Sequence, residues 1–146
     1  MATVLRVDDL IHDTPLSGTG ELSEDPAELA RFWCMVLLMA VRDHASSVHY
    51  HPWRDDGGLA YIVGENRLVL EPPPYRLAGP LLAVARSLLT GTGWVGSPSR
   101  HGWFEGAGAV CSSVVLDIHG DRFPWDAVLW SSGERSGVEL FRAAPP

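Results

Sequence analysis

The stretch that decides the fold is VRDHASSVHYHP, residues 41–52, because the spacing of the apolar side chains changes within it. Before it, residues 25–44 carry apolar side chains at three-and-four spacing behind a helix-capping sequence at 25–28, which predicts an amphipathic helix. After it, residues 48–51 alternate and end at Pro52, which predicts a strand. The chain therefore turns from helix to sheet at this point.

Other segments continue the alternation of strands and helices. We expect a hairpin of residues 59–63 and 67–70, a helix over 80–89, and strands over 102–105, 109–119, 125–131 and 138–142. This order predicts one α+β domain over residues 25–146, with a mostly antiparallel sheet and two main helices on one face. Residues 1–24 form an N-terminal extension that is either a flexible tail, an edge strand or a docking peptide.

Composition excludes several functional classes. The 146 residues suit one domain, and 18 acidic against 11 basic residues give a net charge of −7, which argues against a nucleic-acid binder. All basic residues apart from histidine are arginines, so Schiff-base and P-loop lysine chemistry are absent. The longest apolar run, residues 32–41, is about half the length of a membrane span, and residues 1–24 lack a secretory pattern. We therefore expect a cytoplasmic protein without membrane insertion.

In that compartment, we expect Cys34 and Cys111 to be free thiols rather than a disulfide.

His49 and His51 are the weak candidates for a metal site. Two residues apart on a strand, they face the same side of the sheet and can ligate zinc or another transition ion. The alternative, imidazoles packed on a helix or facing solvent, is favoured by the lack of a second ligand cluster. Residues that could supply a third ligand are His44, Cys111, Asp117 and His119.

No cofactor or catalytic residue is predicted. Residues 91–96 spell G-x-G-x-x-G but lack the preceding strand and following helix of a dinucleotide site. No G-x-S-x-G elbow occurs either, so we do not expect an enzyme. The six tryptophans are many for one small core, and tryptophan is enriched at interaction hot spots. The candidates for an interaction surface, with core anchors as the alternative, are Trp33, Trp94, Trp103, Trp125 and Trp130.

The opening stretch also resembles a known family. Residues 41–52 are similar to the segment that opens the N-terminal PAS-like domain of bacterial type II secretion and type IV pilus assembly ATPases, in which a helix leads into an Ala-Ser-Asp-(Ile/Val)-His-(Ile/Leu)-Glu-Pro strand. Ser47 and His51 replace the family's Asp and Glu, and the matching residues are Ala45, Ser46, Val48, His49 and Pro52. A hairpin, a proline-rich spacer at 72–74 and a second helix follow in the family's order, so the resemblance covers residues 25–142.

Two departures shape what the resemblance implies. The chain ends where the family's motor domain begins, so Walker motifs are absent, and residues 126–129 lack the family's nucleotide-approaching arginines. The resemblance thus implies a PAS-like, non-catalytic protein–protein interaction domain. We expect an accessory or adaptor whose partner belongs to a secretion or pilus machine, with self-association also open. The alternative is a small-ligand or metal-binding sensor domain.

Overall fold

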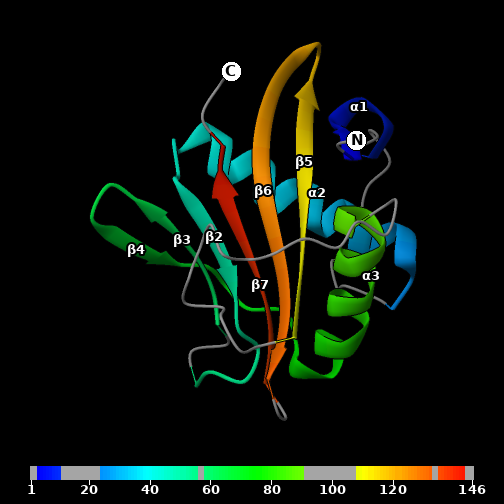
Figure 1. Ribbon diagram of the computed structural model, residues 1–146, viewed down its shortest axis with the longest axis vertical. Helices are drawn as coiled ribbons and strands as arrows, with labels where there is room; N and C mark the ends of the chain where they lie inside the picture. The colour runs from blue at the N-terminus through cyan, green and yellow to red at the C-terminus, as the bar shows by residue number, and fades with distance from the viewer. Residues whose placement is uncertain (1–2, 11–23, 56–57, 91–107, 133–134, 144–146) are drawn as a thin grey trace.

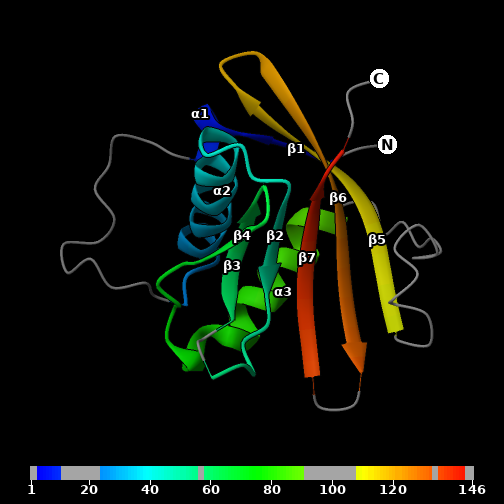
Figure 2. The ribbon, with the colours of Figure 1, turned by 90° about the vertical axis from the view of Figure 1, so that its left-hand side faces the viewer.

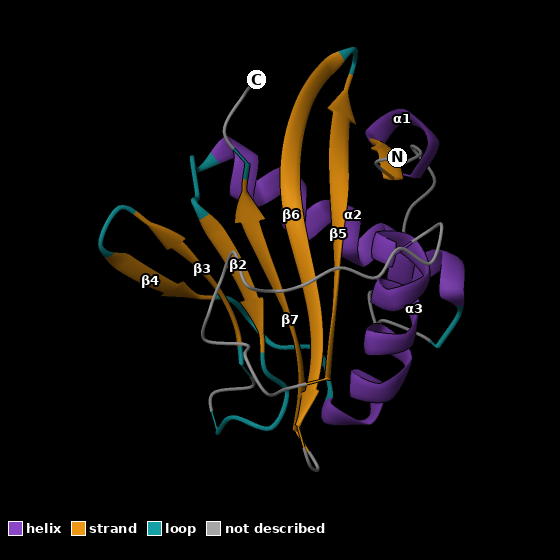
Figure 3. Cartoon of the chain, viewed as in Figure 1, coloured by secondary structure: helices purple, strands orange, loops and turns teal. Residues whose placement is uncertain are grey.

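The computed structural model describes residues 3–10, 24–55, 58–90, 108–132 and 135–143. Helices separate groups of strands along this chain, and its sheet has seven strands (Figures 1 and 3). The strands are β1 (Thr3–Arg6), β2 (Ser47–Tyr50), β3 (Leu59–Val63), β4 (Asn66–Val69), β5 (Gly108–Ile118), β6 (Asp121–Ser132) and β7 (Arg135–Arg142). The helices are α1 (Val7–Leu10), α2 (Pro26–Arg42) and α3 (Ala78–Thr90), with a 3-10 turn at Tyr75–Leu77.

The sheet is mixed, and the chain has the helices and strands of an α+β protein. Its strand order is β1-β5-β6-β7-β2-β3-β4. The β1–β5 pair is parallel, and the other neighbouring strands are antiparallel. The pairing of β2 with β7 is the seam that joins the β2–β4 unit to the β5–β7 unit. In Figure 2, α2 and α3 lie on the same side of the sheet.

The N-terminal residues belong to this domain, which corrects the boundary that we placed at residue 25. Residues 3–6 form β1, whose Leu5 lies opposite Leu116 in the register with β5. Leu5 and Val7 are both buried, with 4% and 8% of their surface exposed. Of the alternatives for residues 1–24, the edge strand therefore holds for residues 3–6, whereas residues 11–23 lie outside the described part of the chain.

The remaining predicted elements differ from the structure mainly at their ends. Strand β6 begins at Asp121, four residues before the expected start, because Pro124 is accommodated in the strand opposite Val115. At Pro124 the carbonyl oxygen accepts a hydrogen bond from the amide of Ala143, so the strand ladder continues there. The strand expected over residues 102–105 lies outside the described residues.

Helix α2 forms where the capping sequence predicts it. The carboxylate of Asp25 accepts a hydrogen bond from the amide of Ala27 at 3.0 Å, and Pro26 occupies the first turn. The helix ends at Arg42, and the following amide, of Asp43, bonds back to the carbonyl of Met39. At 17 residues it is the longest helix of the described chain; no described helix is both long and apolar enough to cross a membrane.

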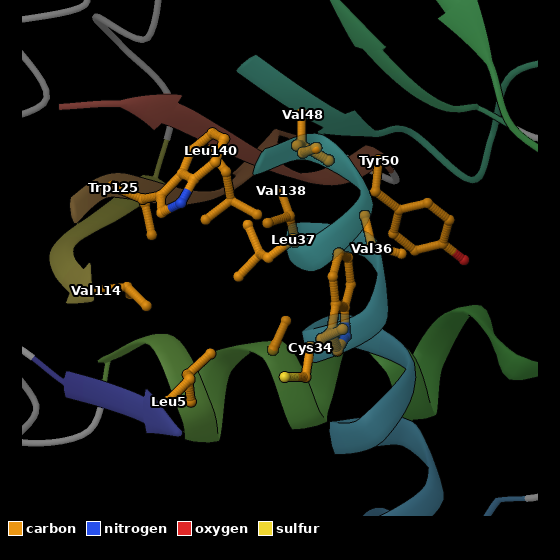
Figure 4. Close-up of a cluster of buried hydrophobic side chains, with 14 of the residues drawn as sticks. Leu5, Cys34, Val36, Leu37, Val48, Tyr50, Val114, Trp125, Val138 and Leu140 are labelled. Carbon is orange, nitrogen blue, oxygen red and sulfur yellow. The ribbon is translucent and has the colours of Figure 1, made fainter. Parts of the chain in front are cut away.

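The core lies between the helices and one face of the sheet. In Figure 4, Leu37 points from α2 toward Val138 and Leu140 of β7. The indole of Trp33 packs edge-on against Tyr50, with ring centroids 5.6 Å apart, and donates a hydrogen bond to the carbonyl of Leu81. This bond ties α2 to α3 across the core.

Two of the tryptophans proposed for an interaction surface are core residues instead. Trp33 is 1% exposed and Trp125 is 0% exposed, so neither can contact a partner on the surface of this fold. Trp33 lies on the apolar side of α2, and Trp125 lies on the helix-covered face of β6 (Figure 4). Alternation of sides along a strand places one tryptophan inside and another outside, which residue type alone does not predict.

Burial of Tyr50 predicts a loss of stability at alkaline pH. Burial raises the pKa of Tyr50 from 10.0 to about 12, so the folded chain holds the phenolic proton more tightly than the unfolded chain. This contribution is complete below the unfolded pKa, amounts to about 2–3 kcal/mol, and is lost as pH rises from 10.0 to about 12. We expect urea unfolding free energies to fall over this range and Tyr50→Phe to flatten the fall. Tyr75→Phe, at a site that is 75% exposed, should keep most of the fall in unfolding free energy. If the free energy of Tyr50→Phe falls with pH as steeply as that of the wild type, Tyr50 is not the group responsible.

Candidate metal centre

The register of the β2–β7 seam places a histidine opposite a glutamate. His49 of β2 pairs with Glu139 of β7, and directly opposed residues of an antiparallel pair share a face. Val48 and Tyr50, the neighbours of His49, lie in the helix-covered core, so His49 and Glu139 lie on the other face of the sheet. His51 follows two residues after His49 and points to the same side. Residues about 90 positions apart in the sequence thus form one cluster.

The donor atoms of the cluster converge on one carboxylate oxygen. Nδ1 of His49 lies 3.0 Å from Oε1 of Glu139, and Nε2 of His51 also hydrogen-bonds this oxygen. One donor atom from each of the three residues lies within 4.8 Å of the others. In the described part of the chain, this is the one group of three or more His, Cys, Asp or Glu side chains with such a spacing.

Outer residues hold two of these side chains in place. The indole NH of Trp130 donates to Oε2 of Glu139. The hydroxyl of Ser47 lies 2.8 Å from Nε2 of His49, the ring nitrogen that does not face the carboxylate. With Nδ1–H of His49 donating to Glu139, Nε2 accepts from Ser47, so this pair of contacts selects one tautomer of His49.

Aromatic rings surround the cluster and limit the access of water. Trp53 stacks on His51 with ring centroids 5.5 Å apart and planes 11° from parallel, and the guanidinium of Arg135 lies 4.5 Å from the centre of the Trp53 ring. Phe141 packs edge-on against His49 at 5.8 Å. The side chain of Glu139 is 0% exposed and those of His49 and His51 are 20% and 16% exposed. In such surroundings, charges interact more strongly than in water.

Glu139 is an ionised carboxylate in spite of its burial. Burial alone would raise its pKa, but the hydrogen bonds from His49, His51 and Trp130, with the attraction of His51, together lower the pKa below its usual value. The buried negative charge is thus balanced by three donors rather than by an arginine or lysine.

Ser47, His49 and Glu139 also have the connectivity of a nucleophilic relay, with a hydroxyl, an imidazole and an acid in a row. Ser47, however, is only 8% exposed and lies in a strand that is paired on both sides, opposite Ile62 and Phe141. With 8% of its surface exposed, Ser47 offers little of its hydroxyl to a substrate carbonyl. We therefore assign the Ser47 hydroxyl an orienting role toward His49.

The sequence identified two members of this cluster only as weak candidates for a metal site and missed the third. His49 and His51 lie together as their spacing predicts, but Glu139 was not among the residues considered as a third ligand. A lone glutamate in the apolar strand segment Val138-Glu139-Leu140-Phe141 was the available signal, because an acid in a buried strand needs a partner. Only the pairing of β7 with β2 identifies that partner.

Of the other residues considered as third ligands, His44, Asp117 and His119 are outside the cluster. His44 follows α2 with a positive φ of 59°, and His119 pairs with Asp8 at 2.9 Å near the β5–β6 turn. The carboxylate of Asp117 accepts a hydrogen bond from the amide of Gly120 in the same turn. Cys111 pairs with Val128 in the register of β5 and β6, but its side chain lies outside the described part of the structure.

The tryptophans considered for an interaction surface divide into three groups. Trp33 and Trp125 are in the core, as described above. Trp130 is half-buried and contacts the cluster through Glu139 and His51. Trp94 and Trp103 lie outside the described residues.

Replacing Glu139 tests whether the network stabilises the fold. Glu139→Gln removes the charge that the two imidazoles share, and we expect it to cost about 1–3 kcal/mol of unfolding free energy. Because the pKa of Glu139 is lowered, its contribution is present above the ordinary value of 4.5 and is lost as pH falls below it, so the variant should also show a shallower loss of stability in acid. Urea unfolding between about pH 3 and pH 7 measures both effects. Glu65→Gln, at an exposed position, is the matched control; equal behaviour of the two variants would contradict the assignment.

Comparison with known proteins does not assign this chain to a family. No protein-family model matches it, and neither a curated protein nor a solved structure gives a match. The resemblance of residues 25–142 to secretion ATPase domains therefore stays a prediction. Function has to be inferred from the chemistry of the cluster itself.

Proposed function

We propose that this protein is a non-catalytic metal-binding domain that takes one divalent transition-metal ion at His49, His51 and Glu139. One observation carries the proposal: two imidazoles and a buried, ionised carboxylate from neighbouring strands bring their donor atoms within 4.8 Å of one another. Imidazole nitrogen with carboxylate oxygen is a donor set that zinc and its neighbours in the transition series accept.

The spacing of the donors suits such an ion. Zinc binds nitrogen and oxygen at about 2.0–2.2 Å, so tetrahedral ligand atoms lie about 3.4 Å apart. The donor atoms of the cluster fall within 4.8 Å, so small side-chain rotations are enough to reach this spacing. Three protein ligands leave a fourth position for water or an exchangeable ligand, so the site differs from a closed structural zinc site.

The residues around the cluster have the roles of an outer ligand shell. Metal-binding histidines commonly hydrogen-bond another group through the second ring nitrogen, and this contact fixes the tautomer and the ring orientation. If His49 binds through Nδ1, its Nε2 carries the proton and donates to Ser47. The ion would then replace the imidazole protons as the partner of the Glu139 carboxylate.

The position of the cluster links metal binding to the stability of the sheet. His49 and His51 come from the β2 side of the seam and Glu139 from β7, so an ion would tie the two units of the sheet together. Because the ion binds a site that exists only in the folded chain, binding adds directly to the free energy of unfolding.

Metal analysis of protein purified without a histidine tag tests the proposal. After dialysis against Zn²⁺ we expect one ion per chain, and a rise in unfolding free energy of about 2.7 kcal/mol when free zinc is a hundredfold above the dissociation constant. His49→Ala and His51→Ala should abolish both effects. The matched controls are His44→Ala and His119→Ala, which remove histidines outside the cluster. Substoichiometric zinc in the wild type, or equal binding by all four variants, rules out the site.

A second proposal follows from the resemblance: a PAS-like adaptor that binds a protein of a secretion or pilus machine. Its support in the structure is β4, the outermost strand at one end of the sheet. All four residues of β4 are exposed, including Leu68 at 42% and Val69 at 50%. An exposed strand edge can add a strand from another chain, either a partner or a second copy.

Charge substitutions on β4 test this second proposal. We expect Leu68→Asp and Val69→Asp to abolish capture of a specific protein from lysate of the source cell, because a charge at a strand edge disfavours strand addition. Capture followed by mass spectrometry, with Tyr75→Ala as an exposed control outside β4, measures the loss. Capture that survives both substitutions would exclude β4 as the contact.

A further inference from the structure

We infer that Trp130 makes Glu139 a one-oxygen ligand and thereby restricts the site to ions that accept four-coordinate geometry, such as Zn²⁺ and Co²⁺, over Mn²⁺ and Ca²⁺. The inference rests on the metal site proposed above and names the class of ion that the site takes. It concerns a specificity-determining residue next to the ligands and assigns Trp130 no bond to the ion.

The two oxygens of Glu139 have different partners. Oε1 faces both imidazoles, whereas Oε2 accepts the indole NH of Trp130. An indole nitrogen is a donor only and does not give up its proton to a metal at neutral pH. Because Glu139 is 0% exposed, loss of this bond would leave Oε2 as a buried charged oxygen without its donor, which is costly. The bond to Trp130 therefore holds Oε2 away from an ion at Oε1.

A glycine fixes the position of the indole. Trp130 lies opposite Gly137 in the register of β6 and β7, two residues before Glu139 on the same side of β7. A Cβ at position 137 would lie 2.9 Å from three atoms of the indole, including Nε1. The ring therefore lies directly on the β7 backbone, where any side chain would displace it. The indole of Trp130 also packs edge-on against the imidazole of His51, with ring centroids 5.9 Å apart.

The number of carboxylate oxygens decides which ions fit. With one oxygen and two nitrogens, the protein supplies three ligands, and one water completes a tetrahedron of the kind that zinc prefers. Calcium takes six to eight oxygens and commonly a two-oxygen carboxylate, and manganese also favours oxygen-rich, six-coordinate sites. A Glu139 held to one oxygen therefore favours zinc and cobalt over the ions that need more oxygen ligands.

Trp130→Phe tests the inference, because it keeps an aromatic ring at this position and replaces the indole, with its NH, by a ring that has no donor. Freed Oε2 can then join the ion and raise its coordination number. In the Co²⁺-loaded protein we expect the strong visible absorption of four-coordinate cobalt to weaken severalfold. Competition between Zn²⁺ and Mn²⁺ should show the preference for zinc falling about tenfold. Gly137→Ala, which displaces the ring by a different route, should change both measurements in the same direction.

Trp33→Phe is the matched control, because it also removes a buried indole hydrogen bond, the one to the carbonyl of Leu81. It should lower stability and leave the cobalt spectrum and the zinc preference unchanged. If Trp130→Phe or Gly137→Ala binds cobalt with the wild-type spectrum and the wild-type preference for zinc over manganese, the inference is overturned. The proposed metal site would then remain intact. Absence of any Zn²⁺ or Co²⁺ binding by the wild type overturns the metal site and the inference together.

Discussion

The pairing of β2 with β7, with His49 opposite Glu139, is the contact on which the rest of the structure depends. It joins two antiparallel units that are far apart in the sequence into one sheet. Its register also decides which side chains lie on each face. A slip of one residue would turn His49 toward the helices and Val48 away from them, so the core and the polar cluster would be lost together.

The same seam therefore serves two environments. On one face, Tyr50 and Val138 lie opposite each other and pack under α2. On the other face, Glu139 is fully buried as an ion, which is costly unless donors surround it. His49, His51 and Trp130 supply those donors, and the result is a fully hydrogen-bonded carboxylate between paired strands. A cation would find its ligands already oriented, because the fold has met the cost of ordering them.

The sequence predicted those helices and strands that are specified by a short local feature, such as a helix cap or a change in the spacing of apolar residues. The cap at residues 25–28 and the change of period at 41–52 gave the helix α2 and the strand β2 almost to the residue. Patterns left alternatives open, or misplaced the end of a strand, where a distant partner decides the outcome. Thr3–Arg6 is a strand because β5 offers a parallel edge, and the start of β6 passes Pro124 because β5 extends alongside it. Propensity is a weak guide where strand pairing supplies the stabilisation.

The sequence by itself determined the α+β alternation, the absence of lysine chemistry and the placing of His49 and His51 on one side of a strand, since these follow from composition and from spacings of two to four residues. Only the tertiary structure decided that Glu139 joins them, and that Trp130 holds one of its oxygens while Trp125 packs in the core. The reason is physical: a strand's residue pattern fixes the side on which each residue lies, but strand order and register choose its neighbours, and these depend on burial summed over the whole sheet.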